Sequence, residues 1–178
     1  RACLSAIVDT YLAALVAHDP SKAPMARGAR FTENTGVLEV GEGLWVGASA
    51  APTTFKIYVP DPATSQIGFL GMLREFDRPV LLALRLRVQT ARIVEAEHIV
   101  VRSLNDAGLK NLVRPRAAFA ADVAPANRVP RAEMIRIADS YYDSLSKGIG
   151  ALPPYADDCV RHENGMQTST NRTPPPLP

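Results

Sequence analysis

Apolar residues recur every three or four positions at the start of the chain, from residue 2 to residue 18. That spacing predicts an amphipathic helix with one buried face. Pro20 ends it, because proline cannot continue a helix and also restricts the residue before it. A short turn or helix over 20–27 should follow. The apolar positions are Leu4, Ile7, Val8, Tyr11, Leu12, Leu15 and Val16.

The pattern then changes from a helical period to strands. Residues 29–35 and 37–40 are typical of short strands, and residues 48–55, after Gly47, are expected to form a second helix. Four further stretches rich in β-branched and large apolar residues are separated by plausible hairpin turns. These predicted strands are residues 56–59, 66–75, 79–88 and 92–102. The first 103 residues therefore predict a helix, short strands, a helix and an antiparallel meander.

The beginning of this pattern recurs later in the chain. When the sequence is shifted by 130 positions, residues 1–34 align with residues 131–164 without a gap. Unrelated segments of this composition would share far fewer positions, and two amphipathic helices would not keep their polar residues in register. The identical pairs are Arg1/Arg131, Ala2/Ala132, Ile7/Ile137, Asp9/Asp139, Tyr11/Tyr141, Leu15/Leu145, Pro24/Pro154, Ala26/Ala156, Glu33/Glu163 and Asn34/Asn164.

The repeat predicts a duplicated domain whose second copy is incomplete. We expect a first domain over residues 1–103, a linker over 104–129 and the N-terminal part of a second domain over 130–178, beginning with a helix over 131–147. The run from Pro174 to Pro178 cannot supply sheet hydrogen bonds, so the second copy lacks a meander. Its missing strands should come from elsewhere in the polypeptide or from another subunit. Sheet-to-sheet packing of the two copies, as a pseudo-dimer within one chain, is the expected assembly; a homo-oligomer is the alternative.

Composition excludes several classes of protein. The net charge of +2 is small and its signs are mixed along the chain, so no basic stripe for nucleic acid is present. No apolar run approaches the roughly 20 residues that span a bilayer. The sequence does not begin with methionine, so we expect that either a signal peptide or another N-terminal segment preceded Arg1; a signal peptide would imply export to the periplasm or outside the cell. Two cysteines are too few for a disulfide framework.

Three short motifs carry a resemblance to a known superfamily. They are Arg30-Phe31-Thr32-Glu33-Asn34, Gly41-Glu42-Gly43-Leu44-Trp45 and Arg161-His162-Glu163-Asn164-Gly165. With the helix and meander around them, they resemble the NTF2-like superfamily, which includes SnoaL-like and ketosteroid-isomerase-like proteins, and within it a tandem-repeat group of unassigned function. The resemblance implies an α+β, cone-shaped fold in which a long N-terminal helix packs on a curved antiparallel sheet. It also implies a pocket for a small apolar or aromatic molecule.

The strand motifs supply the candidate chemistry. Side chains alternate along a strand, so Phe31 and Glu33 share one face while Thr32 and Asn34 share the other, and the sequence leaves open which face lines the pocket. A carboxylate inside the cone would be partly desolvated, which raises its pKa toward that of a general base. The second copy is richer in such groups, because His162 stands where the first copy has Thr32 and Asp158 stands where it has Gly28.

The candidate residues fall into two sets. The proposed catalytic residues are His162, Glu163, Asp158 and Tyr142. The proposed ligand-binding residues are Arg161, Asn164, Gln167 and Tyr141 in the second copy and Tyr11, Glu33, Asn34, Trp45 and Tyr58 in the first. The structural alternative is that the Glu-Asn pair caps a helix end or fixes the strand to the long helix. In the same way, Asp-x-Tyr would make a helix-to-sheet hydrogen bond, and His98 would be a sheet residue with its hydrogen bonds satisfied.

Two functions from different classes remain open. The first is a cofactor-independent acid–base enzyme, of isomerase, lyase, cyclase or hydrolase type, acting on a small apolar or aromatic metabolite. The second is a non-catalytic module for small-molecule binding or dimerisation, which predicts a pocket filled by side chains or a ligand left unchanged. No metal is expected, because the sequence has no His-x-His, no His-Glu-x-x-His and no cysteine pair at ligand spacing.

Overall fold

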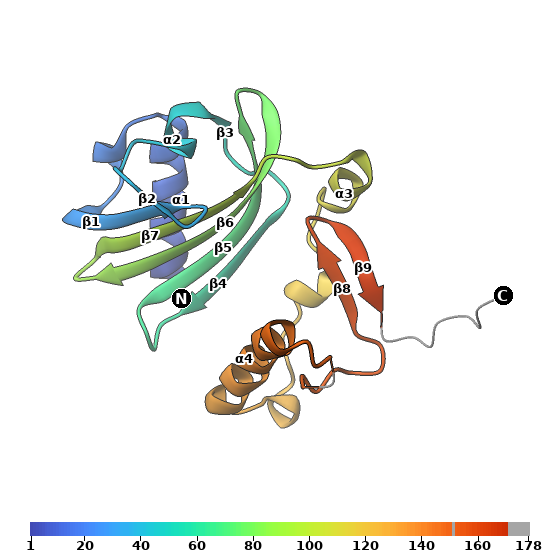
Figure 1. Cartoon of the computed structure of the whole chain (residues 1–178). Coiled ribbons are helices and arrows are strands. Elements are labelled where there is room, and N and C mark those ends of the chain that lie inside the picture. The colour runs from blue at the N-terminus through green and yellow to red at the C-terminus, as the bar shows by residue number, and fades with distance from the viewer. Residues whose placement is uncertain (151, 171–178) are drawn as a thin grey trace. The chain divides into compact units, whose positions relative to one another are not determined.

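The computed structural model describes residues 1–150 and 152–170. The chain divides into two compact units, Arg1–Phe119 and Ala120–Pro178 (Figure 1). The division falls inside the stretch predicted as a linker. Each unit is described separately below.

The N-terminal unit is built on a seven-stranded sheet with the strand order β2-β1-β7-β6-β5-β3, in which β4 also pairs with β5. All strand pairs are antiparallel except β1 with β7, which is parallel. Its elements are α1 (Ala2–Val16), η1 (Pro20–Lys22), β1 (Met25–Glu33), β2 (Gly36–Leu38), α2 (Leu44–Gly47), β3 (Ala48–Ala50), β4 (Lys56–Asp61), β5 (Gln66–Glu75), β6 (Arg78–Gln89), β7 (Arg92–Val101), α3 (Asp106–Asn111) and η2 (Ala117–Phe119).

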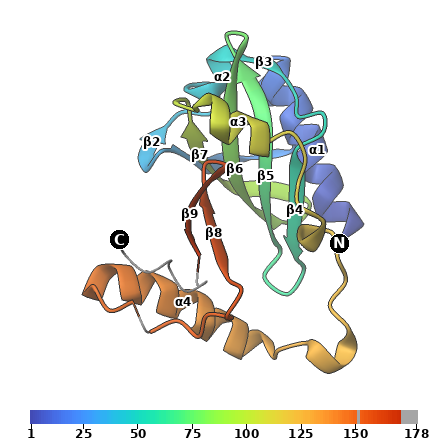
Figure 2. The same ribbon diagram turned by 90° about the vertical axis from the view of Figure 1, so that its right-hand side faces the viewer.

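The core of this unit lies between α1 and the inner face of the sheet (Figure 2). The helix buries the side chains of Val8, Tyr11, Leu12 and Leu15, as its apolar period predicts. The central strands alternate buried and less buried positions, which places one apolar row of each strand against the helix. The predictions of an α+β fold and of a long N-terminal helix packed on a curved, mainly antiparallel sheet are confirmed.

The segment between β2 and β4 differs from its prediction. The prediction of a helix over residues 48–55 is wrong. The helical turn is α2 (Leu44–Gly47), and Ala48–Ala50 form the strand β3. Gly43 begins this turn with φ +60° and ψ −127°, a backbone conformation that favours glycine. The pairing of β3 with β5 overrides the helical propensity of its alanines.

The segment expected to be a linker contains a helix. Asn105 caps α3 by accepting a hydrogen bond from the Gly108 amide at 2.7 Å, a common way to begin a helix. The following Leu112 is buried with Phe55 and Leu81 in a second, smaller apolar cluster. The first part of the predicted linker therefore belongs to the N-terminal unit, and the contacts of Leu112 with residues distant in sequence explain why no local pattern revealed it.

The C-terminal unit contains η3 (Pro125–Asn127), α4 (Arg131–Lys147), β8 (Val160–Glu163) and β9 (Met166–Thr170). Helix α4 coincides with the helix predicted over 131–147. Strands β8 and β9 pair in a two-stranded sheet. The proline run at 174–178 lies outside the described residues.

The hairpins β1–β2 and β8–β9 share one turn geometry. Glu33 pairs with Gly36 across the turn formed by Asn34 and Thr35, and the φ angles of those two residues are +47° and +72°. Glu163 pairs with Met166 across Asn164 and Gly165, which have φ angles of +50° and +84°. Two-residue hairpin turns of type I′ have positive φ at both central positions, which favours asparagine and glycine. This requirement gives the recurrent asparagine a structural role and supports the duplication, which stays a prediction.

Candidate functional site

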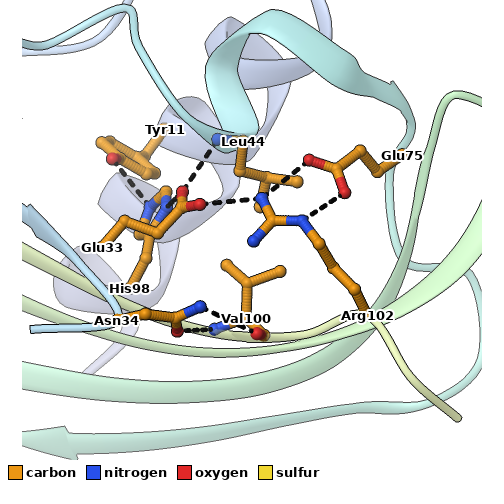
Figure 3. Close-up of polar contacts among 8 residues, drawn as sticks. All are labelled: Tyr11, Glu33, Asn34, Leu44, Glu75, His98, Val100 and Arg102. Carbon is orange, nitrogen blue, oxygen red and sulfur yellow. Dashed lines mark hydrogen bonds and ion pairs between the residues drawn. The ribbon is translucent and has the colours of Figure 1, made fainter. Parts of the chain in front are cut away.

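Glu33, one of the predicted ligand-binding residues, is buried and lies beside His98 and Arg102 (Figure 3). Its carboxylate accepts a hydrogen bond from the Leu44 amide at 2.8 Å and therefore caps the first turn of α2. It also forms an ion pair with Arg102 at 2.7 Å, and Arg102 in turn binds Glu75 through two hydrogen bonds of 2.6 and 2.8 Å. One guanidinium thus neutralises two buried carboxylates.

The pKa of Glu33 moves in the direction opposite to the one a general base needs. Burial of the carboxylate acts to raise the pKa, but the neighbouring His98, Arg102 and the Leu44 amide outweigh burial and lower it to about 2. The expectation of a raised pKa for a carboxylate inside the cone is therefore wrong for Glu33. Its interactions match the structural alternative, in which the residue caps a helix end.

His98 connects the sheet to the long helix. Its Nε2 lies 3.0 Å from the Tyr11 hydroxyl and its Nδ1 lies 3.6 Å from the Glu33 carboxylate. Burial holds the pKa of His98 below its usual range, although the nearby carboxylate acts to raise it. In the neutral tautomer with the proton on Nδ1, the Nε2 of His98 accepts a hydrogen bond that the Tyr11 hydroxyl donates. Burial also disfavours the charged form of Tyr11 and so raises the pKa of its hydroxyl. The sequence predicts His98 to be a sheet residue with its hydrogen bonds satisfied, and no local pattern indicates its position beside Glu33.

Aromatic side chains occupy the space between α1 and the sheet in this unit. Tyr11, Phe31, Trp45 and His98 are each at most 1% exposed. Tyr11 meets Trp45 edge to face at 5.1 Å between ring centroids, and Phe31 meets His98 in the same way at 4.9 Å. The region where the resemblance implies a ligand is therefore filled by the protein's own rings.

The other two predicted residues of the first copy make structural contacts. The Asn34 side chain accepts from the Val100 amide at 2.8 Å and donates to the Val100 carbonyl at 3.2 Å, extending the pairing of β1 with β7. The Tyr58 hydroxyl donates to Asp9 at 2.5 Å, which is a helix-to-sheet hydrogen bond. Partial burial together with this carboxylate raises the pKa of Tyr58 to about 12. The aspartate of the Asp-x-Tyr motif thus joins the helix to β4 in the first copy, while Tyr11 joins it to β7.

The C-terminal unit contains an open pocket of about 570 Å³ between α4, the loop after it and the β8–β9 hairpin. Two of the predicted ligand-binding residues line it. Tyr141 comes from α4 and Arg161 from β8, and the guanidinium carbon lies 5.8 Å from the centre of the Tyr141 ring. The sequence did not predict the other lining residues. They are Ser144, Leu145, Gly148, Gly150, Tyr155, Cys159 and Ser169.

The remaining candidates of the second copy do not line this pocket. Tyr142 is 69% exposed, and His162 is half-buried on β8. Glu163 is exposed and forms an ion pair with Arg161, as their shared strand face predicts. Asp158, Asn164 and Gln167 are exposed as well. The structure thus brings Tyr141 and Arg161 together at the pocket, while none of the four proposed catalytic residues lines it.

Two classes of site find no support in the described part of the chain. No group of three or more histidine, cysteine, aspartate or glutamate side chains is arranged to hold a metal ion among residues 1–150 and 152–170. Within the same residues, no helix combines the length and hydrophobicity needed to cross a membrane.

Comparisons with known proteins were made for sequence and for fold. Residues 127–176 match the family described as a domain of unknown function, DUF8021. No curated protein matches the sequence.

The similar solved structures include three with informative names. An NTF2-like protein of unknown function from Cytophaga hutchinsonii shares 9% identity, with 53% of this chain and 87% of that chain covered and a TM-score of 0.43. A protein provisionally named as a ketosteroid isomerase, from Kribbella flavida, shares 11% identity, with coverages of 70% and 92% and a TM-score of 0.46. A protein provisionally named as a polyketide cyclase, from Sinorhizobium meliloti, shares 20% identity, with coverages of 52% and 92% and a TM-score of 0.39. The solved structures similar to this chain thus include NTF2-like and ketosteroid-isomerase-like proteins, the superfamily that its sequence motifs resemble.

Proposed function

We propose that this chain binds a small, largely aromatic or apolar molecule in the pocket of its C-terminal unit, and that its N-terminal unit is a non-catalytic scaffold. The pocket carries the proposal. Its volume of about 570 Å³ lies within the range of small-molecule sites, and its lining combines two tyrosine rings with a leucine and two glycines. By contrast, the rings of Tyr11 and Trp45 fill the interior of the N-terminal unit.

Acid–base conversion of the bound molecule is the more specific alternative. It would need a carboxylate or imidazole against the ligand, with a pKa near the working pH. Asp158 and Glu163 are exposed, and Glu33 has a pKa of about 2 and is bound to Arg102. These observations favour binding without conversion. A ligand recovered chemically unchanged from the protein would support this choice, and a ligand converted at a rate that falls in a Glu163→Gln variant would support the enzyme.

The pocket can be tested with 2-naphthol, a neutral aromatic probe, in calorimetric titrations of the full chain. Leu145 lines the pocket and is 56% exposed, so a Leu145→Gln variant should fold while losing apolar contact with the probe. We expect the dissociation constant to rise about tenfold, the effect of roughly one lost apolar side-chain contact.

Ile135 provides a matched control for this variant. It lies on the same helix, is 48% exposed and does not line the pocket. An Ile135→Gln variant should bind 2-naphthol within about twofold of the parent, since surface changes away from the site have small effects. Equal losses in both variants, or no binding by the parent chain, would contradict the proposal.

A further inference from the structure

The pocket of the C-terminal unit holds a single cationic group among its described lining residues, the guanidinium of Arg161. The other lining residues are tyrosine, serine, leucine, glycine and cysteine, none of which has a cationic side chain. The guanidinium lies 5.8 Å from the centre of the Tyr141 ring. A cation beside an aromatic face is a combination that recognises anions with a planar apolar body.

The position of Arg161 is unusual when the two halves of the sequence are compared. The 130-residue shift aligns Arg161 with Phe31, and it aligns Tyr141 with Tyr11. Phe31 is 1% exposed and packs against the His98 ring in the core of the N-terminal unit. A guanidinium cannot replace a core phenyl ring without an anionic or hydrogen-bonding partner. The pocket therefore has a cationic group at the position that serves apolar packing in the other unit.

The present partner of Arg161 is easily replaced. Arg161 and Glu163 share one face of β8, and their side chains are 40% and 49% exposed. Ion pairs with this much exposure contribute little to stability, because water and salt screen them. A carboxylate presented by a ligand can take the place of Glu163, and a planar carboxylate matches the two parallel N–H donors of a guanidinium.

We infer that the ligand of this pocket is an aromatic carboxylate, held by Arg161 through its anionic group and by Tyr141, Leu145 and Tyr155 through its ring system. This inference rests on the proposed function, since it names the chemical class that the same pocket takes. It adds the requirement for a negative charge, which the apolar lining by itself would not impose. It also assigns Glu163 the role of a competitor for Arg161 rather than that of a general base.

The test compares 2-naphthoate with 2-naphthol, which have the same ring system and differ in the anionic group. The full chain should bind 2-naphthoate about tenfold more tightly than 2-naphthol, as expected for a charge-assisted hydrogen bond. An Arg161→Gln variant should lose this preference and bind both probes within about twofold of each other. A Glu163→Gln variant should bind 2-naphthoate up to about fivefold more tightly than the parent, because the competing carboxylate is gone.

Arg136 supplies the control for the loss of one positive charge. It forms an exposed ion pair with Glu133 on α4 and does not line the pocket, so an Arg136→Gln variant should keep the preference for 2-naphthoate. If 2-naphthol binds and depends on Leu145, but 2-naphthoate shows no preference that Arg161→Gln removes, the inference fails while the proposed function stands. If neither probe binds the parent chain, both fail.

Discussion

Replacing Trp45 with alanine should lower the free energy of unfolding of the N-terminal unit by about 3–5 kcal/mol, the usual cost of removing a large buried ring. Trp45 is 1% exposed and meets the Tyr11 ring edge to face. Since Tyr11 also contacts His98, the cavity would open at the point where α1, α2 and the sheet meet. A Trp45→Phe variant keeps an aromatic ring and should lose less than half as much.

Urea titrations of the full chain would measure this effect, followed by hydrogen exchange of the backbone amides in β5 to β7. Exchange is the better probe because Trp45 is the single tryptophan, so the variant has no tryptophan fluorescence. Val46 is the matched control, since it lies next in α2 and is 62% exposed. Val46→Ala should change stability by less than about 0.5 kcal/mol. A Trp45→Ala variant as stable as this control would show that the rings do not form the core described above.

The meander could be predicted because its pattern is local. Residues 66–75 and 92–102 alternate along each strand, and strands β5 and β7 occupy Gln66–Glu75 and Arg92–Val101. The first and last helices were predictable for the same reason. Strand β3 could not be predicted in this way, because alanine has a low strand propensity. Its pairing partners, Glu75 and Arg74, lie more than twenty residues away in the sequence.

The candidate site shows more clearly that a local pattern does not reveal contacts between residues distant in the sequence. The motif drew attention to Glu33, but the side chains that lower its pKa are His98 and Arg102, and Arg102 lies 69 residues later in the sequence. When these partners are not known, burial alone predicts a raised pKa for Glu33, which is the opposite of the outcome. The alternating pattern predicts His98 to lie in a strand, but its position beside Glu33 depends on the register of β7 with β1.

The second copy illustrates what a repeat can and cannot predict. Position 31 is a core phenylalanine in one half, and its counterpart at position 161 is an arginine lining a pocket. The proposed repeat predicts the helix over 131–147, which α4 matches, and a strand at the Glu-Asn motif, but it did not predict the pairing of β8 with β9. It could not indicate the pocket, since burial of Phe31 depends on strands that have no counterpart among the described residues of the second unit.

Replacing Arg102 with methionine should lower the free energy of unfolding by about 3 kcal/mol at pH 7, because a buried ion pair that loses one partner leaves an uncompensated charge. In this case the change leaves two carboxylates, those of Glu33 and Glu75, without their cationic partner, and their side chains are only 7% and 10% exposed. Methionine keeps much of the side-chain volume, so lost packing contributes little. The same change at Arg87, which pairs with Glu95 on the exposed part of the sheet, should cost less than about 1 kcal/mol.

The pH dependence separates this explanation from a simple loss of contacts. In the parent chain the pKa of Glu33 is about 2 when folded and near its usual value of 4.5 when unfolded. Its contribution to stability is therefore complete above pH 4.5 and is lost as the pH falls from 4.5 to 2. Without Arg102 the folded pKa of Glu33 rises, because burial is then opposed by fewer favourable contacts, so the variant loses less stability over the same range. In urea titrations, the difference in free energy of unfolding between the parent and Arg102→Met should thus shrink as the pH is lowered from 7 to 3. A difference that stays constant with pH would mean that Arg102 stabilises the fold by packing and not by neutralising Glu33.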